Sequence, residues 1–312
     1  MTEQADDLRR VGSALGSLAR PDHPLGALTT YRVGGPARLF VEPADEAELG
    51  AVAAAIDGRD VPVLVLGRGS NLLVADAGFS GLVVSLAQGF DEIAIDGASV
   101  RAGGAVSFPV LARKSASAGL TGLEWAVGVP GSVGGAIRMN AGGHGSDTAH
   151  VLVGCRVADL ASGVTTDVPV ADLAYAYRHS SLSCSQVVVA GTFELQPGNA
   201  EESLAQIAEI VRWRREHQPG GSNAGSVFTN PPGDSAGRLI EEAGLKGHRI
   251  GSAEVSPKHA NFIQADVDGS AADVRRLIED VQRRVRERFG VELATEVRMI
   301  GFGTAAGPRP PS

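Results

Sequence analysis

Residues 61–72 read VPVLVLGRGSNL, an apolar run that passes directly into a glycine-rich turn. Val61 to Leu66 has the length and composition of a strand, and we expect it to be buried on both faces. Gly67 to Asn71 follows at once, and glycine lets a backbone turn tightly and approach a ligand closely. The stretch therefore predicts a strand of an α/β unit whose loop contacts a bound molecule.

The residues on either side of this stretch complete the α/β unit. Thr30 to Val33 is expected to be a strand that breaks into a turn at Gly34. Asp45 and Glu48 have the spacing of a capping box and predict the start of a helix. We therefore assign residues 1–20 to an N-terminal surface helix and residues 21–78 to a first subdomain.

Beyond this unit the residue pattern changes twice. Residues 79–198 alternate short β-branched runs with Gly and Asp turns, which predicts a strand-rich second subdomain. Residues 199–303 return to helical periodicity, with Asp234 expected to cap one helix and Ser270 another, and form a third domain. Residues 304–312 are Ala-, Gly-, Pro- and Ser-rich and are expected to be a disordered tail.

A second glycine-rich loop, Gly128 to Ala136, strengthens the case for a bound nucleotide. Loops of this kind let backbone N–H groups converge on an anion, and two of them suit a pyrophosphate better than one. The first loop is not a Rossmann fingerprint, because Leu72 stands where the third glycine belongs, and neither loop carries a Walker A lysine. The pattern indicates a phosphate-bearing cofactor without naming it.

Composition excludes several classes of function. The 312-residue chain carries 28 basic and 36 acidic residues, and its net charge of −8 argues against binding nucleic acid or an anionic membrane. It has two cysteines in no metal-like spacing, no signal peptide pattern and no apolar run long enough for a membrane span. We therefore expect a cytoplasmic, monomeric protein.

Two further patterns have an ordinary structural interpretation. His144, Asp147 and His150 could be read as a metal cluster, but no second ligand pair accompanies them, so surface loop residues are the better interpretation. Ser226 does not sit in a hydrolase elbow, since Phe228 occupies the last position of that motif. Patterns alone do not reveal the reaction.

Eleven separated motifs, in this order, resemble those of the UDP-N-acetylenolpyruvoylglucosamine reductase family over nearly the whole chain. They are Tyr31–Gly35, Gly69–Leu73, Gly122–Glu124, Val129–Gly135, Met139–Gly142, Tyr177–Ser180, Ala224–Phe228, Asn230–Pro231, Leu239–Glu241, Lys258–Ile263 and Glu296–Arg298.

The resemblance implies an α+β fold. Its FAD-binding part is of the vanillyl-alcohol-oxidase (PCMH) type in two α/β subdomains, and a C-terminal α/β substrate-binding domain follows. The FAD is held non-covalently and is reduced by NADPH, after which its N5 passes a hydride to C3 of UDP-N-acetylglucosamine enolpyruvate. The implied cofactor-binding residues are Tyr31, Arg32, Gly67, Arg68, Gly69, Ser70, Asn71, Leu72, Gly128, Pro130, Gly131, Ser132, Gly134 and Gly135.

The resemblance also implies three catalytic residues. Arg178 matches the cation that holds the substrate carboxylate, Ser226 the proton donor to C2, and Glu296 a group that supports the intermediate. The implied substrate-binding residues are Tyr177, Arg214, Asn230 and Lys258. One subclass of the family has an inserted loop that places a tyrosine over the substrate, and the short spacing from Arg178 to Ser226 resembles the subclass without it.

Two other functions are compatible with the same fold. A flavin oxidase often carries a covalent histidine link, and no histidine lies in Gly67 to Leu73 or Gly128 to Ala136. A non-catalytic nucleotide-binding paralogue is expected to lack at least one of Arg178, Ser226 and Glu296, and all three are present.

Overall fold

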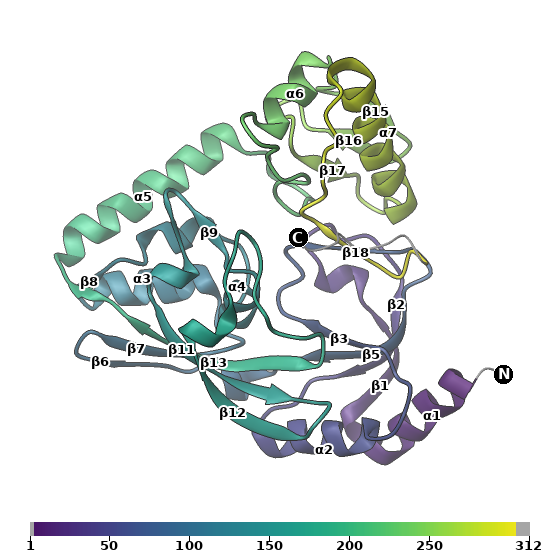
Figure 1. The fold of residues 1–312 in the computed structure, drawn as a ribbon, viewed down its shortest axis with the longest axis vertical. Helices are drawn as coiled ribbons and strands as arrows, with labels where there is room; N and C mark the ends of the chain where they lie inside the picture. Colours follow the sequence, from purple (N-terminus) through teal and green to yellow (C-terminus); the bar gives the residue numbers. More distant parts are fainter. Residues whose placement is uncertain (1–2, 304–312) are drawn as a thin grey trace. The chain divides into compact units, whose positions relative to one another are not determined.

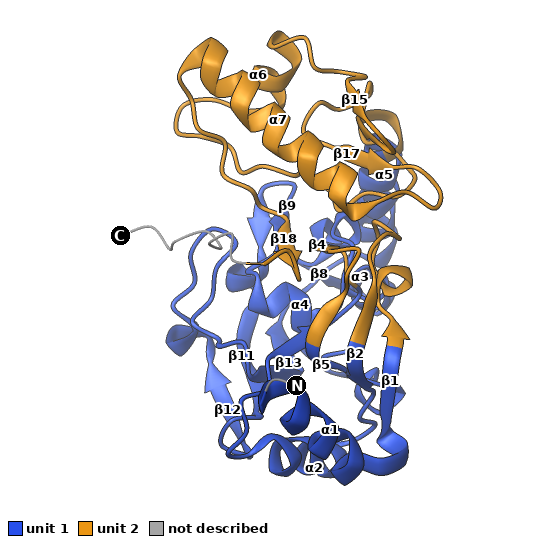
Figure 2. Ribbon diagram, turned by 90° about the vertical axis from the view of Figure 1, so that its right-hand side faces the viewer, with its two compact units in different colours: residues 1–22, 38–68, 81–214 blue, residues 23–37, 69–80, 215–312 orange. Residues whose placement is uncertain are grey.

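The computed structural model describes residues 3–303, and the chain forms two compact units. Unit 1 contains residues 1–22, 38–68 and 81–214, and unit 2 contains residues 23–37, 69–80 and 215–312 (Figure 2). The chain thus enters unit 2 three times. The domain boundaries expected from the sequence stay predictions.

Unit 1 contains most of a four-stranded sheet of order β1–β2–β5–β3, in which β3 and β5 run parallel. Its strands are β1 (Ala19–Pro24), β2 (Pro36–Val41), β3 (Val63–Leu66) and β5 (Phe79–Ser85). Helices α1 (Glu3–Leu15) and α2 (Glu46–Ile56) lie side by side (Figure 1) and share one apolar core with this sheet. Asp45 caps α2 by accepting a hydrogen bond from the Glu48 N–H at 2.8 Å, which confirms the predicted start.

The burial of β3, the strand before the first glycine-rich loop, differs from the prediction. Only Leu64 and Leu66 of β3 are buried, whereas Val63 and Val65 are partly exposed. Val63 and Val65 pack against the apolar core that this sheet shares with α1 and α2 without being fully covered, and β3 is the last strand in the order of its sheet. The expectation of burial on both faces was wrong for this strand.

A second sheet of unit 1 is antiparallel and has the order β12–β11–β13–β7–β6. Its strands are β6 (Ile93–Asp96), β7 (Ser99–Gly103), β11 (Leu152–Asp159), β12 (Val164–Pro169) and β13 (Gln186–Glu194). Helices α3 (Phe108–Ser117) and α4 (Val133–Arg138) contribute to the core beneath it, together with the middle of α5 (Ala200–His217). Two short pairs complete the unit: β8 (Leu120–Thr121) with β14 (Gln196–Pro197), and β9 (Gly142–Gly143) with β10 (Ser146–Asp147).

Unit 2 has its own apolar core between helices and a small antiparallel sheet. Its elements are β15 (Arg249–Ile250), β16 (Ala253–Val255), β17 (Ile263–Ala265), α6 (Ala236–Glu242) and α7 (Ala271–Phe289). In addition, β4 (Leu72–Val74) pairs in parallel with β18 (Arg298–Ile300), which joins the first glycine-rich loop to the C-terminal segment. The mixture of helices and strands agrees with the expected α+β class.

Two local expectations were wrong. Thr30 to Val33 forms no strand, because this segment turns instead, with the Arg32 N–H donating to the Thr29 carbonyl at 3.3 Å. Ser235, not Asp234, caps α6 through a bond from the Arg238 N–H, while Asp234 forms an ion pair with Arg238. Both residues of an Asp-Ser pair are good caps, so the sequence pattern could not separate them.

The tail expected after Gly303 lies outside the described residues. Within residues 3–303, we find no helix with both the length and the apolar composition that crossing a bilayer demands.

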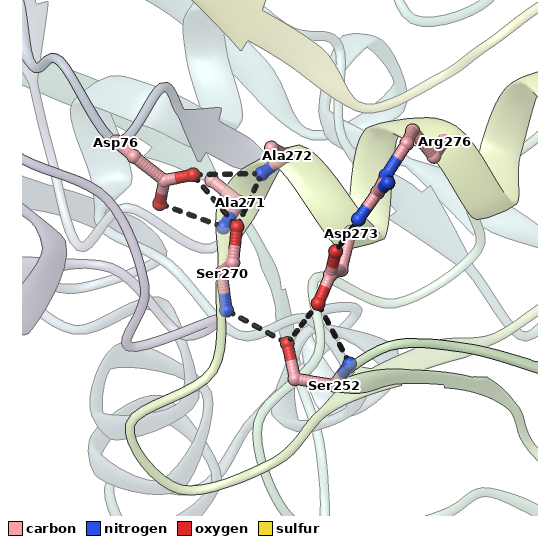
Figure 3. Close-up of polar contacts among 7 residues, drawn as sticks. All are labelled: Asp76, Ser252, Ser270, Ala271, Ala272, Asp273 and Arg276. Carbon is pink, nitrogen blue, oxygen red and sulfur yellow. Dashed lines mark hydrogen bonds and ion pairs between the residues drawn. The ribbon is translucent and has the colours of Figure 1, made fainter.

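The N-terminus of α7 is held by a residue from a distant part of the chain (Figure 3). The Asp76 carboxylate accepts bonds from the Ser270 hydroxyl at 2.8 Å and from the N–H groups of Ala271 and Ala272 at 2.8 and 3.0 Å. Asp273 does not close a capping box onto Ser270 but accepts from the Ser252 N–H and hydroxyl. α7 is therefore tied to the segment that follows the first glycine-rich loop.

We expect Asp76→Ala to lower the free energy of unfolding by about 1 kcal/mol, the typical effect of removing a helix cap. Burial opposes ionisation of Asp76, but the bonds from Ser270, Ala271 and Ala272 outweigh it and hold the pKa of this carboxyl below its usual value. A lowered pKa stabilises the fold above the ordinary pKa of about 4 and loses this effect as pH falls through the lower, folded value.

Denaturant unfolding at several pH values tests this expectation. The difference in free energy of unfolding between wild type and Asp76→Ala should be largest near neutral pH and should become smaller in acid. Asp60→Ala, a change at another exposed carboxylate, is the matched control and should leave stability within about 0.5 kcal/mol. A difference that stays constant with pH would show that the charge of Asp76 is not what holds the helix.

Candidate functional site

The two glycine-rich loops line one pocket of unit 1, with a volume of about 220 Å³. The first loop contributes Gly67 and Arg68 after β3, and the second contributes Ser132, Gly134 and Gly135 at the start of α4. The loops that the sequence singled out separately therefore meet in space.

The packing of these loops leaves little room for a side chain at position 67. A Cβ atom there would lie 2.6 Å from the Ser132 hydroxyl oxygen, which is closer than such atoms approach. That hydroxyl is itself occupied, because it accepts a hydrogen bond from the Gly135 N–H at 3.2 Å. The Gly134 N–H in turn donates to the Gly104 carbonyl at 2.9 Å. These two N–H groups hold the loop together, so its glycines serve close approach more than direct anion binding.

Positive charge in this pocket comes from two arginines. Arg68 belongs to the first loop, and Arg138, which motif reasoning missed, is the last residue of α4. Arg138 is oriented by bonds to the carbonyls of Leu182 and Ser183 at 3.0 and 2.6 Å. Two guanidinium groups beside glycine-lined backbone suit a pyrophosphate. The position of Arg138, two residues after the second loop, was the available signal in the sequence.

In unit 2 the segment before the first loop carries two buried polar atoms with no partner. They are the hydroxyls of Thr30 and Tyr31, two of three such atoms in the part of the chain that the structure describes. Tyr31 is completely buried, and its burial raises the pKa of the phenol far above its usual value. The Thr30 N–H donates to the Gly69 carbonyl at 3.2 Å, which brings this segment to the loop. Adjacent buried hydroxyls without partners fit a site completed by a bound molecule.

Two residues beside Thr30 and Tyr31 have left-handed backbone conformations, and one of them lies very close to neighbouring backbone. Gly69 has φ +59°, and a Cβ there would lie 2.5 Å from the Leu28 carbonyl oxygen. Arg32 adopts φ +57°, a conformation that non-glycine residues seldom take. The conformation of Arg32, next to the two unpartnered hydroxyls, makes this segment a candidate part of a binding site.

Asn71, which the resemblance assigns to the cofactor, contacts one of the catalytic candidates, Glu296. Its side-chain amide donates to the Glu296 carbonyl at 3.3 Å, and its own carbonyl accepts from the Arg298 N–H at 3.0 Å. The Glu296 N–H donates to the Val227 carbonyl at 2.8 Å, next to Ser226. Unit 2 thus brings together Asn71, Glu296 and the Ser226 segment through backbone contacts.

The Ser226 turn is held by a buried asparagine that sequence reasoning did not single out. Asn261 donates to the Phe228 carbonyl at 2.8 Å and accepts from the Phe228 N–H at 3.0 Å, while its own carbonyl accepts from the Val227 N–H at 2.9 Å. Only 4% of Asn261 is exposed. Ser226 itself is half-buried on the turn after Gly225, which has φ +77°.

A second pocket of unit 1, with a volume of about 280 Å³, is lined by Tyr177 and Arg178. The Arg178 guanidinium donates to the Gly142 carbonyl at 3.0 Å, and its central carbon lies 5.2 Å from the centre of the Tyr177 ring. Arg178 belongs to unit 1, whereas Ser226 and Glu296 belong to unit 2.

The remaining substrate-binding candidates have different surroundings. Burial lowers the pKa of Arg214, whose side chain would lie 3.5 Å from a Cβ on Gly128, the first residue of the second loop. Lys258 donates from its ammonium to the Arg215 carbonyl, and Asn230 accepts from the Ala236 N–H at 3.1 Å. Arg214 lies in unit 1 and the other two in unit 2.

The histidines show no metal site. His150 pairs with Asp147 at 2.6 Å, whereas the His144 ring packs edge-on against Trp213 at a centroid distance of 5.4 Å. Burial, together with the charge of Arg214, lowers the pKa of His144. Among residues 3–303 no group of three or more His, Cys, Asp and Glu side chains could hold a metal ion.

Comparison with known proteins places these features in a family. Residues 37–168 match the FAD binding domain family, and residues 217–300 match the UDP-N-acetylenolpyruvoylglucosamine reductase C-terminal domain family. The UDP-N-acetylenolpyruvoylglucosamine reductase of Rubrobacter xylanophilus is 42% identical over 91% of this chain and 95% of its own length. That of Acidiphilium cryptum is 43% identical over 90% of this chain and 91% of its own length.

A solved structure gives the same result for the fold. The UDP-N-acetylenolpyruvylglucosamine reductase of Thermus caldophilus superposes with a TM-score of 0.79 at 37% identity, covering 90% of this chain and 99% of that one. The expected fold of FAD domain plus C-terminal domain is thereby confirmed.

Proposed function

The chain belongs to the UDP-N-acetylenolpyruvoylglucosamine reductase family, and from this we propose that it reduces UDP-N-acetylglucosamine enolpyruvate to UDP-N-acetylmuramate with NADPH. This reaction supplies a precursor of peptidoglycan. The observation that carries the proposal is the identity of 42% with a reductase of that name over 91% of this chain. We further propose that the enzyme works in the cytoplasm as a monomer, without nucleic acid or membrane partners, which its net charge of −8 supports.

The residues present fit a non-covalently bound FAD. The 220 Å³ pocket of unit 1 offers Arg68 and Arg138 for the pyrophosphate. When bound, FAD supplies the hydride that is added to C3 of the enolpyruvyl group. The protein's task is to hold this cofactor and to manage the charge and the proton that the addition creates.

Addition of hydride at C3 leaves negative charge at C2 and on the neighbouring carboxylate. Arg178 is the residue we assign to this charge, because a guanidinium binds a carboxylate through two parallel N–H bonds. Its contact with the Gly142 carbonyl at 3.0 Å fixes the orientation of the fork. The Tyr177 ring beneath the guanidinium restricts it further.

Completion of the reaction needs a proton at C2, which we assign to the Ser226 hydroxyl. A serine hydroxyl is a weak acid, so its position must be fixed accurately, and Asn261 fixes the two residues that follow it. We assign Glu296 to support of the developing charge through a hydrogen-bonded or protonated carboxyl group, because a bare anion there would repel the intermediate.

We propose that the diphosphate of the substrate is bound by Arg214, Asn230 and Lys258. Arg214 is partly buried, and a guanidinium group suits the oxygens of a phosphate. The short spacing from Arg178 to Ser226 supports assignment to the subclass without the inserted tyrosine loop.

The test is NADPH oxidation by the purified protein, followed by absorbance, with and without UDP-N-acetylglucosamine enolpyruvate. We expect a yellow protein whose NADPH oxidation depends on this substrate. Oxidation that is slow and indifferent to the substrate would instead indicate a flavin oxidase, and a protein that binds FAD without oxidising NADPH would be a non-catalytic paralogue.

A further inference from the structure

The motif Met139–Gly142 contains a buried polar residue with no role in the assignments above. Asn140 is 6% exposed and adopts φ +39°, the left-handed region, where asparagine is one of few non-glycine residues found. A buried amide in such a conformation is costly unless its hydrogen bonds are satisfied. Asn140 also lines the same 280 Å³ pocket as Arg178.

The Asn140 amide contacts two separate segments around this pocket. Its nitrogen donates to the Ala176 carbonyl at 3.3 Å and to the Asp147 carboxylate at 3.4 Å, and its oxygen accepts from the Ala149 N–H at 3.0 Å. Exchanging the amide oxygen and nitrogen would set donor against donor at Ala149 and acceptor against acceptor at Ala176. The partners therefore define its orientation.

The first of these segments is the turn that carries Arg178. Ala176 and His179 exchange two backbone hydrogen bonds, of 3.2 and 3.1 Å, and enclose Tyr177 and Arg178 between them. Arg178 has φ +54°, so the turn holds a non-glycine residue in a conformation that is rarely populated. A bond to the Ala176 carbonyl braces this turn at its base.

The second segment is the hairpin that receives the Arg178 side chain. β9 and β10 pair Gly142 with Asp147, and the Gly142 carbonyl accepts from the Arg178 guanidinium at 3.0 Å. Asn140 is hydrogen-bonded to Asp147 in this hairpin and to Ala149, which follows it. One amide thus spans the turn that bears Arg178 and the hairpin that orients its guanidinium.

We propose that Asn140 is a positioning residue of the reaction, which sets the guanidinium of Arg178 against the substrate carboxylate. The inference rests on the proposed function of Arg178. Asn140 itself touches neither substrate nor cofactor in this role. Its contribution is the alignment of the Arg178 fork, and a displacement of about 1 Å in such a group costs about 10²-fold in rate.

Asn140→Asp is the informative substitution, because aspartate keeps the size and the acceptor but loses both donors. We expect kcat to fall about 10²-fold, the KM for NADPH to stay unchanged, and FAD to remain bound. Asn140→Gly, which tolerates φ +39°, is the second variant in case the aspartate prevents folding. Asn199→Asp is the matched control, since Asn199 is an exposed helix-capping residue at which aspartate serves equally well.

A double-mutant cycle with Arg178→Ala separates positioning from general stability. If Asn140 acts through Arg178, then Asn140→Asp should change kcat by less than about threefold once Arg178 is gone. Equal losses of kcat in both backgrounds would overturn the proposal, as would a single variant with wild-type kcat. An inactive wild-type protein would instead refute the proposed function.

Hydrogen exchange tests the same inference without any turnover. The amides of Ala176 and His179 are protected by their mutual bonds, and we expect Asn140→Asp to make them exchange faster while Asn199→Asp does not. Unchanged exchange at both amides would show that Asn140 does not brace the turn.

Discussion

Ser226→Ala should slow reoxidation of the reduced flavin by UDP-N-acetylglucosamine enolpyruvate by about 10²–10⁴-fold, the usual contribution of a positioned proton donor. Ser226 is half-buried on a turn whose next two residues are fixed by Asn261. The backbone of the turn therefore keeps its position when the hydroxyl is removed, so the loss measures proton delivery rather than misfolding. Rapid mixing of the two half-reactions isolates the affected step.

The NADPH half-reaction is the internal reference, because it needs no proton from Ser226. We expect its rate to stay within about threefold of wild type, with a full complement of FAD. Ser222→Ala, four residues earlier in the same segment, is the matched control; the Ser222 carbonyl still accepts from the Ala265 N–H there. Wild-type reoxidation in Ser226→Ala would remove Ser226 from the role of donor and make Glu296 the next residue to test.

Local signals in the sequence predicted helix α7, but they did not predict the residue that holds its N-terminus. The helical periodicity and the cap Ser270 indicated where the helix begins. Gly290 ends it with φ +71°, the left-handed conformation that is common at helix C-termini. The carboxylate of Asp76 at its N-terminus comes from 194 residues earlier in the chain. Nothing near Asp76 reveals this partner, because a cap is recognisable only from its own helix.

In the site too, patterns within one segment were predictable from the sequence, whereas hydrogen bonds between distant segments were not. The glycines of both loops were visible as a pattern, and the pocket that they share confirms that they converge. Asn140 and Asn261 belong to motifs quoted above, but nothing in the sequence indicated their structural role. Each satisfies backbone groups of another segment, 36 residues away for Asn140 and Ala176 and 33 for Asn261 and Phe228. Such bonds follow no periodicity, so single-sequence reasoning has no means of pairing them.

The same reasoning explains why β3 was misjudged. Its apolar run is continuous, but Val63 and Val65 are partly exposed, and Val65 lines the pocket of the two loops. An apolar face beside a pocket is indistinguishable in sequence from one that packs against a helix. A continuous apolar run therefore predicts the strand but does not show which of its side chains are fully buried.

Arg178→Lys should lower kcat for substrate reduction by about 10²–10³-fold, comparable to the loss of one preorganised donor to a developing oxyanion. Lysine keeps the positive charge, so electrostatic attraction of the carboxylate persists and the KM for the substrate should rise only slightly. What it loses is the planar fork, which carries the bond to Gly142 and the stacking on Tyr177.

An ammonium cannot both retain the Gly142 carbonyl and present two parallel N–H groups to a carboxylate. Steady-state kinetics, with FAD content and melting temperature as controls, separates this geometric effect from loss of charge in Arg178→Ala. If lysine and alanine were equally defective in kcat but differed in KM, the fork would be the catalytic element and the charge only a binding element. If lysine instead restored wild-type kcat, charge alone would suffice, and the elaborate support of this turn by Asn140 would need another explanation.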